Sequence, residues 1–191
     1  MMRWALTRIV FLLLLAFLAG CGARLVTDSP PEKTEVVQVG EYTVTRVTDG
    51  DTIEVRPEID GVNDVRFIGV DTPEKYGPEG SQPLADEAAA FTERALEESG
   101  NRVTLRFDVE KVDRYGRVLA YVYLRDGYMH NQLLLESGYA QVATFPPNVR
   151  YLDEFRRAQS AAREAGRGIW GLPARDACEL ADRGNGIGGG C

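Results

Sequence analysis

Residues 42–73 read YTVTRVTDGDTIEVRPEIDGVNDVRFIGVDTP, and this stretch decides the fold. β-Branched residues are dense in residues 42–56, and the acidic turn at 48–51 interrupts them. That pattern predicts two strands joined by a short turn. A second turn near residues 57–63 leads into an apolar run at 65–70. We therefore expect a meander of three strands.

The residues that follow alternate between helical and strand patterns. Apolar residues recur at helical spacing over residues 84–99, alternate with polar residues over 103–107, and mark a fifth strand at 117–124. Two more helices are predicted at residues 128–137 and 148–165, each followed by a glycine. Five short strands with a helix between the third and fourth predict an α+β fold, a five-stranded Greek-key barrel of the OB type with three α-helices. Such a barrel leaves one face open for a ligand.

Composition limits the chemistry more than the fold. The chain has 191 residues, of which 44% are hydrophobic and 27% charged, and its net charge is −7; these values are typical of a folded domain. It contains one histidine, His130, so a multi-histidine zinc site or a two-histidine acid/base pair cannot be built within the chain. A Ser-His-Asp site with His130 as its base stays open. Otherwise catalysis is expected to use carboxylates, arginines or a hard metal ion.

The first 20 residues are predicted to be an export signal. Two arginines precede the apolar run Ile9 to Ala19, and a bilayer needs about 20 apolar residues for a spanning helix. The residues before Cys21, Leu18-Ala19-Gly20, resemble a bacterial lipobox, which predicts cleavage before Cys21 and its lipidation. The alternative is a signal that is uncleaved or not lipidated, with Cys21 buried. We expect an extracytoplasmic protein, anchored to the cell membrane at Cys21 or secreted, whose net charge becomes −9 once residues 1–20 are removed.

Three further segments follow the signal. Residues 21–40 are polar and rich in Pro and Glu, as in a tether; residues 41–171 form the domain; and residues 172–191 are a tail that ends in a glycine run. Cys178 and Cys191 flank 12 residues of this tail, and an exported chain favours a disulfide between them. A free or intermolecular thiol at Cys191 is the alternative.

Acidic residues stand at the ends of the predicted strands. Asp49, Asp51 and Asp71 can converge if the meander brings these ends together, and clustered carboxylates favour a hard cation. The alternatives are a surface Asp-Gly turn at Asp49 and a helix N-cap at Asp71, with Pro73 and Glu74 in the first turn.

Two arginines accompany these acids. Arg66 lies within an apolar strand, and Arg117 follows the turn at residues 113–116. A buried guanidinium needs either a carboxylate or a phosphate as its partner. Each arginine alone can be a structural ion-pair partner, but two arginines, a hard cation and a carboxylate base are the set that phosphodiester cleavage requires.

Three motifs resemble those of the staphylococcal nuclease (thermonuclease) family. They are TDGDT at residues 48–52, RFIGVDTPE at 66–74 and DRYGR at 113–117, in the family's order and with similar spacing. The likeness extends through DGYMHN at 126–131 and GIW at 168–170. The resemblance implies an OB barrel with three helices that hydrolyses DNA and RNA in a Ca²⁺-dependent reaction, yielding 3′-phosphorylated products.

The resemblance also implies roles for the acidic residues. Asp51 and Asp71 would bind Ca²⁺ through their carboxylates, and Thr72 would bind it through its backbone oxygen. Asp49 would support the metal site from behind these ligands.

The remaining roles concern the phosphate and the attacking water. Glu74 would be the general base, and Arg66 and Arg117 would grip the scissile phosphate. Arg114 and Tyr115 would bind a terminal phosphate and a base. His130 has no role in these motifs, and we interpret it as a structural or surface residue.

One segment departs from the family pattern. Where the family has two tyrosines lining the nucleotide pocket, this chain has ATFPP at 143–147, so Phe145 is the local aromatic that could replace them.

We expect a monomer. The competing hypotheses are an OB-fold lipoprotein that has lost catalysis and binds nucleic acid, and one that binds an oligosaccharide or scaffolds an envelope complex.

Overall fold

The computed structural model describes residues 38–76 and 80–181. Within them the chain forms strands and helices in this order: β1 (Gln38–Asp49), β2 (Thr52–Ile59), β3 (Val62–Phe67), β4 (Val70–Asp71), α2 (Ala85–Glu98), β5 (Arg102–Arg106), β6 (Val118–Tyr123), α3 (His130–Glu136), β7 (Gln141–Val142), α4 (Leu152–Glu164), the 3₁₀ helix η1 (Gly168–Gly171) and α5 (Ala174–Ala181).

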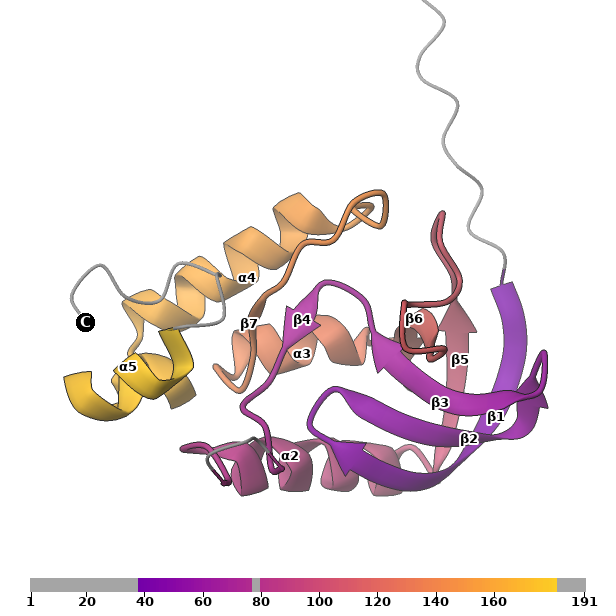
Figure 1. Cartoon of the computed structure of the whole chain (residues 1–191), viewed down its shortest axis with the longest axis horizontal. Coiled ribbons are helices and arrows are strands. Elements are labelled where there is room, and N and C mark those ends of the chain that lie inside the picture. The colour runs from indigo at the N-terminus through magenta and orange to yellow at the C-terminus, as the bar shows by residue number, and fades with distance from the viewer. Residues whose placement is uncertain (1–37, 77–79, 182–191) are drawn as a thin grey trace, which may run out of the picture. The chain divides into compact units, whose positions relative to one another are not determined.

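Five strands close into a barrel in the order β1-β2-β3-β6-β5, with β5 pairing back onto β1. All the neighbours are antiparallel except β3 and β6, which are parallel. The predicted five-stranded OB barrel is therefore confirmed. The helices α4, α3 and α2 lie one below another beside the barrel in Figure 1.

The alternation of apolar and polar residues along the strands gives the barrel an apolar interior. In β5, Val103 and Leu105 are buried while Arg102 is exposed and Thr104 and Arg106 are only partly covered, as expected for a strand with one face on the core. The same alternation in the other strands supplies the barrel core, whose fully buried members include Ile53, Val55, Val65, Phe67, Val118, Ala120 and Val122.

The register of β2, β3 and β6 determines where polar side chains meet. Thr52 pairs with Arg66 across β2 and β3, and Arg66 pairs with Leu119 across β3 and β6. The backbone N–H of Phe67 also donates to the carbonyl of Asp51 at 2.9 Å. The acidic turn after β1 is thereby fixed beside the end of β3.

The third strand begins and ends three residues earlier than expected. It was expected to run through residues 65–70, but β3 ends at Phe67 and β4 begins at Val70, pairing with β7 in a separate two-stranded sheet. Gly69 has a φ of 79° between them, and a Cβ there would lie 2.6 Å from the ring of Phe155. The close approach of α4 therefore bends the chain at a position that only glycine fits.

The three predicted helices are present with shorter bounds. α2, α3 and α4 lie within the expected ranges, and the glycines after them have positive φ values, such as 67° at Gly100. These glycines end the helices as C-terminal caps. α3 and α4 start later than expected, at His130 and Leu152.

The ends of the described chain differ from the sequence prediction in two places. β1 begins at Gln38, inside the segment predicted as a tether, and α5 occupies Ala174–Ala181, inside the predicted tail. Leu180 of α5 is buried, and its carbonyl accepts a hydrogen bond from the Gln141 side chain at 3.4 Å. The glycine run that suggested a tail begins only after this helix.

The predicted signal, Cys21 and Cys191 lie outside the described residues, so lipidation and the Cys178–Cys191 disulfide stay predictions. In the part of the chain that the structure does describe, every helix is too short or too polar to span a membrane.

Candidate active site

The acidic turn between β1 and β2 is buried although it carries two carboxylates. Asp49 and Asp51 are only 8% and 4% exposed. One oxygen of Asp49 accepts a hydrogen bond from the Gly50 N–H at 2.9 Å, and the other faces the Lys75 N–H at 3.4 Å. A Cβ on Gly50 would lie 2.8–2.9 Å from the side chain of Thr72, so the turn packs tightly against the loop after β4.

Asp51 ties this turn to the neighbouring segments. One carboxylate oxygen accepts from the Thr52 hydroxyl at 3.1 Å, and the other accepts from the Thr72 N–H at 2.8 Å. The second oxygen also forms an ion pair with Arg66. Three contacts from three segments therefore orient one carboxylate.

Arg66 lies between two carboxylates. Its guanidinium pairs with Asp51 and, at 2.9 Å, with Asp71, and its side chain is 13% exposed. Burial alone would lower the pKa of Arg66, but the charges of Asp51, Asp71 and Glu74 outweigh it and raise the pKa above its ordinary value. The arginine that the sequence placed inside an apolar strand is thus a fixed cation within an acidic site.

Glu74 belongs to the same cluster and is held by its backbone. Its N–H donates to the side chain of Gln82 at 2.8 Å, and its carbonyl accepts from the Gln82 N–H at 3.0 Å. Its carboxyl group hydrogen-bonds to Asp49. Burial, followed by the charge of Asp51, raises the pKa of Asp49 despite this bond and those from Gly50 and Lys75.

Arg117 is held by a different acid. Asp113 accepts from Nε of Arg117 at 2.8 Å and pairs with its Nη2 at 2.7 Å, and it also accepts the backbone N–H groups of Tyr115 and Arg117. Partial burial raises the pKa of Asp113, but these bonds outweigh it and leave the pKa lower than usual. The DRYGR turn therefore presents Arg117 in one orientation.

Arg114 and Tyr115 sit on the outside of this turn. Nη2 of Arg114 donates to the Tyr115 hydroxyl at 2.6 Å, and its guanidinium lies 4.7 Å from the ring centroid. The guanidinium carbon of Arg117 lies 5.5 Å from the centroid of the same ring. Tyr115 is 69% exposed, so its ring is open to a base or sugar.

Arg66 lies on β3, and Arg117 immediately precedes β6, the strand that pairs in parallel with β3. Arg66 pairs with Leu119, which is two residues after Arg117. Strands about 4.8 Å apart with a rise of about 3.3 Å per residue place the two Cα atoms roughly 8 Å apart.

The carboxylates do not all converge on one point. Asp51 and Asp71 meet at Arg66, whereas Asp49 turns toward Glu74. Across residues 38–76 and 80–181, no group of three or more His, Cys, Asp and Glu side chains is arranged to hold a metal ion. Asp49 thus lies beside Asp51 and Glu74 rather than on Arg66, and the metal-binding roles expected for Asp51, Asp71 and Thr72 stay predictions. The remaining side-chain donors are two carboxylates, whose oxygen chemistry fits a hard cation.

Most of the described domain matches one known protein family. The family model described as "Staphylococcal nuclease homologue" matches residues 64–171, more than half of the chain. The chain belongs to the staphylococcal nuclease family.

Relatives from two genera extend this match over most of the domain. The thermonuclease of Staphylococcus intermedius is 42% identical over 146 residues, covering 75% of this chain and 84% of the relative. The thermonuclease of Staphylococcus hyicus is 38% identical over 151 residues, covering 77% and 87%. Endonuclease YncB of Bacillus subtilis is 40% identical over 143 residues, covering 73% and 66%. This staphylococcal nuclease homologue is an enzyme that hydrolyses phosphodiester bonds.

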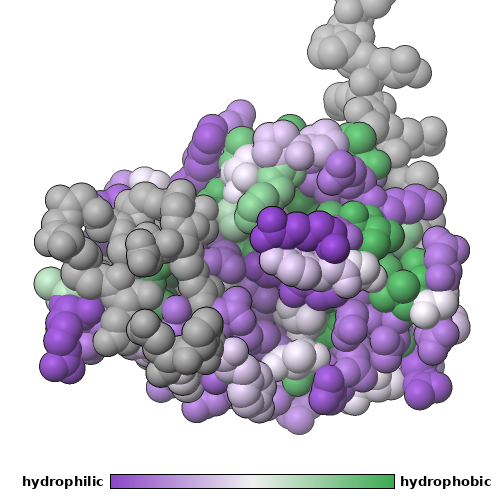
Figure 2. All heavy atoms as spheres, in the orientation of Figure 1, coloured by the Kyte–Doolittle hydropathy of each residue, from purple (hydrophilic) through white to green (hydrophobic). Residues whose placement is uncertain are grey.

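The segment that departs from the family pattern lies between β7 and α4. Phe145 is 74% exposed, and its backbone bridges to Asn148. The Asn148 side chain is bonded at 2.8 Å to both the N–H and the carbonyl of Glu110. Hydrophilic side chains cover most of the face seen in Figure 2, with hydrophobic ones in smaller patches. An exposed ring on such a surface is available for stacking.

Sequence reasoning missed the polar support beneath the acidic turn. His130 and Thr92 are fully buried, and a hydrogen bond of 2.9 Å joins His130 Nε2 to the Thr92 hydroxyl oxygen. The Thr92 hydroxyl in turn donates to the carbonyl of Gly50 at 2.6 Å. A signal was available: Thr92 stands midway between Ala88 and Leu96 on the apolar face of the predicted helix, where a hydroxyl needs a partner.

Proposed function

We propose that this protein is a Ca²⁺-dependent nuclease that hydrolyses DNA and RNA to 3′-phosphorylated products at the cell surface. The observation that carries the proposal is the position of Arg66 between Asp51 and Asp71, with Glu74 in the same cluster. Hydrolysis of a phosphodiester needs a guanidinium to bind the phosphate, oxygen atoms to hold a cation, and a carboxyl group near the attacking water.

The residues that would hold Ca²⁺ are Asp51 and Asp71 through carboxylates and Thr72 through its backbone oxygen. Asp49 would support this group through the Gly50 N–H and the turn. When bound, the ion neutralises phosphate charge and orients a water. The fixed carboxylate of Asp51, with contacts from Thr52 and Thr72, supports this assignment because it is oriented before any ligand arrives.

Arg66 and Arg117 would bind the scissile phosphate from two sides. Nε and Nη2 of Arg117 are held by Asp113; among the described residues its Nη1 has no hydrogen-bond partner. Nη1 can therefore donate to a phosphate oxygen without any change of the turn. Stabilising the charge that develops on the phosphoryl oxygens lowers the barrier by the same physics as an oxyanion hole.

Glu74 would take the proton of the attacking water or hold that water in line. Its backbone is fixed by Gln82, and its carboxyl group faces Asp49. Arg114 and Tyr115 would bind a terminal phosphate and a base, with Phe145 as a further stacking surface.

The proposed location rests on the amino-terminal sequence. Lipidation at Cys21 would anchor the protein to the membrane, with the following residues as a tether, and the domain would act there as a monomer. Metabolic labelling with a palmitate analogue tests it: labelling lost in Cys21→Ala supports the anchor, and equal labelling of both proteins contradicts it.

The activity is tested with the purified protein on single-stranded DNA, duplex DNA and RNA across a range of Ca²⁺ concentrations, with and without a chelator. We expect cleavage that the chelator abolishes and fragments that a 3′-phosphatase can dephosphorylate. Glu74→Gln and Arg117→Ala should lose cleavage and stay folded, whereas Arg46→Ala, on an exposed ion pair of β1, should keep it. Nucleic-acid binding without cleavage would instead favour the non-catalytic module.

A further inference from the structure

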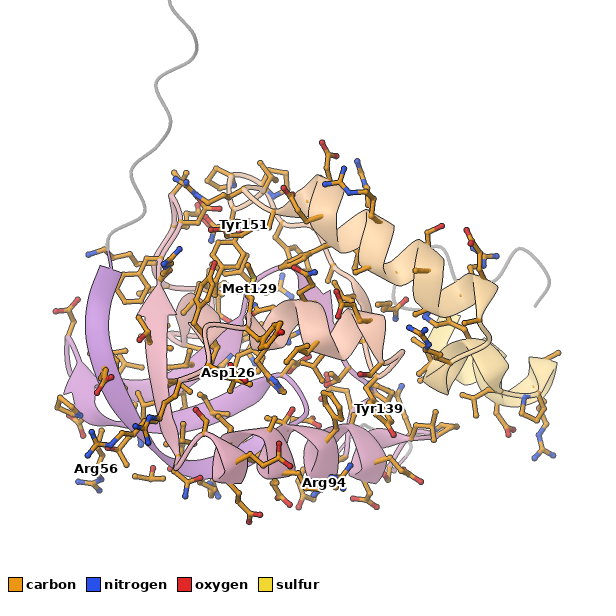
Figure 3. All side chains as sticks on the ribbon, turned by 180° about the vertical axis from the view of Figure 1, so that it is seen from behind. Arg56, Arg94, Asp126, Met129, Tyr139 and Tyr151 are labelled. Carbon is orange, nitrogen blue, oxygen red and sulfur yellow. The ribbon has the colours of Figure 1, made fainter. Side chains whose placement is uncertain are left out.

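The single histidine of the chain is a buried residue that the proposed reaction does not use. His130 is the first residue of α3 and is 0% exposed. Its ring stacks on Phe91 at a centroid distance of 5.7 Å and meets the edge of Phe67 at 5.8 Å. Figure 3 shows the setting: α3 lies above α2, with Met129 at the start of α3 and Tyr139 between the helices.

The hydrogen bonds of this residue define its protonation. The Gly50 carbonyl can only accept, so the hydroxyl proton of Thr92 points toward it across 2.6 Å. The oxygen of Thr92 is then an acceptor for His130, and Nε2 of His130 must carry the hydrogen across 2.9 Å. Nδ1 has no hydrogen-bond partner in the described part of the chain. The neutral imidazole with hydrogen on Nε2 is the form that satisfies the most groups.

The chain of bonds ends on the turn between Asp49 and Asp51. Thr92 donates to the Gly50 carbonyl, and the side chain of Thr72 occupies the space beside Gly50 that a Cβ would need. The position of the turn is therefore limited by a hydrogen bond to Thr92 and by contact with Thr72. The hydroxyl of a threonine without other hydrogen bonds can rotate among several acceptors. Here the imidazole of His130 is held by Phe91 and Phe67 and donates to the Thr92 oxygen, so the Thr92 hydroxyl proton is directed to the Gly50 carbonyl.

We propose that Thr92 and His130 are positioning residues that fix the acidic turn in the geometry that binds the cation. The inference rests on the proposed function, because it concerns the same turn, but it assigns a role to residues outside the three motifs. Partners behind metal ligands orient those ligands and contribute to metal affinity without touching the metal. Thr92 acts through Gly50, and His130 acts through Thr92.

The test compares variants that remove the bonds with variants that keep them. Thr92→Val keeps the branched shape and removes the hydroxyl, while Thr92→Ser keeps the hydroxyl. His130→Leu removes the donor, while His130→Gln keeps an N–H near the place of Nε2. Calorimetric titration with Ca²⁺ alone should show an affinity loss of about tenfold for Thr92→Val, a smaller loss for His130→Leu, and near wild-type affinity for the two conservative variants.

Two further measurements separate positioning from a general loss of stability. Leu96→Val, one turn along the same helix and buried in the core, should lower the melting temperature and leave Ca²⁺ affinity unchanged. Cleavage by Thr92→Val should recover toward wild-type turnover at saturating Ca²⁺. In the metal-free protein, ¹⁵N NMR of the single imidazole should show hydrogen on Nε2 and none on Nδ1.

The outcomes are distinguishable. If the wild type neither binds Ca²⁺ nor cleaves nucleic acid, the proposed function and this inference are both overturned. If the wild type does both and Thr92→Val binds Ca²⁺ as tightly, only this inference is overturned, as it is if Leu96→Val loses Ca²⁺ affinity in step with its stability. Should Thr92→Val fail to fold, the comparison of His130→Leu with His130→Gln decides the question.

Discussion

Burial of His130 makes the stability of the protein depend on pH below neutrality. Burial lowers the pKa of His130 from 6.5 to about 4, because the charged ring would lose its hydration and its hydrogen bond to Thr92 does not make up for that loss. The folded protein therefore keeps the neutral ring while the unfolded chain takes up a proton. This contribution to stability is complete above pH 6.5, is lost as the pH falls from 6.5 to 4, and is constant below that.

The size of the effect follows from the pKa difference. A difference of roughly 2.5 units corresponds to about 3 kcal/mol in total, of which about 2 kcal/mol is lost by pH 5. Urea unfolding of the wild type and His130→Gln at pH 7.5, 5 and 4 measures it, since the carboxylates titrate alike in both proteins. The advantage of the wild type over the variant should shrink by those amounts.

Two results would refute this reasoning. One is a stability difference between the two proteins that does not change from pH 7.5 to 4. The other is an NMR titration of the only imidazole in the chain that gives an ordinary histidine pKa. Either would mean that the ring is hydrated or paired with an acid in solution.

The other predictions concern the acidic turn at Gly50, the support of Arg117 by Asp113, the exposed ring of Phe145 and the net charge. Gly50→Ala should push the turn away from Thr72, destabilise the protein by about 1–3 kcal/mol and reduce cleavage more than tenfold; full activity in a gel assay would contradict the close approach. Asp113→Asn should weaken the interaction that orients Arg117 and lower kcat by about tenfold, equivalent to about 1.4 kcal/mol, with little change in the melting temperature. An unchanged kcat would mean that Arg117 does not need the Asp113 carboxylate to orient it. Phe145→Ala should raise KM for single-stranded DNA severalfold and leave the Ca²⁺ midpoint unchanged, which steady-state kinetics can decide. Because the net charge is −7, KM should be high at low Ca²⁺ and should depend on salt less than in a basic homologue; a steep loss of binding between low and moderate salt would count against this.

Local patterns in the sequence predicted the strands and most of the acidic cluster. The alternation around Val103 and Leu105 and the Asp-Gly turn at residue 49 need only a few neighbours to define them. Arg66 stood out because an arginine between buried neighbours must have a partner, and Asp51 and Asp71 are those partners.

Features that depend on contacts between distant segments could not be predicted from local patterns in the sequence. The strand through residues 65–70 is broken because Phe155, far along the chain, packs over Gly69. The pairing of Arg117 with Asp113 rather than with the acidic cluster depends on how a turn closes in space. His130 lies 38 residues from Thr92, and nothing in the spacing of either residue indicates the other.

The packing of Phe155 over Gly69 has a consequence for when the enzyme becomes active during its synthesis. α4 is among the last parts of the domain to leave the ribosome, yet it shapes the bend that leads to Asp71 and Thr72. A nascent chain that already exposes the earlier strands still lacks the helix that orders this loop. We expect such incomplete chains to be unable to hydrolyse phosphodiester bonds until α4 has been synthesised and has packed over Gly69.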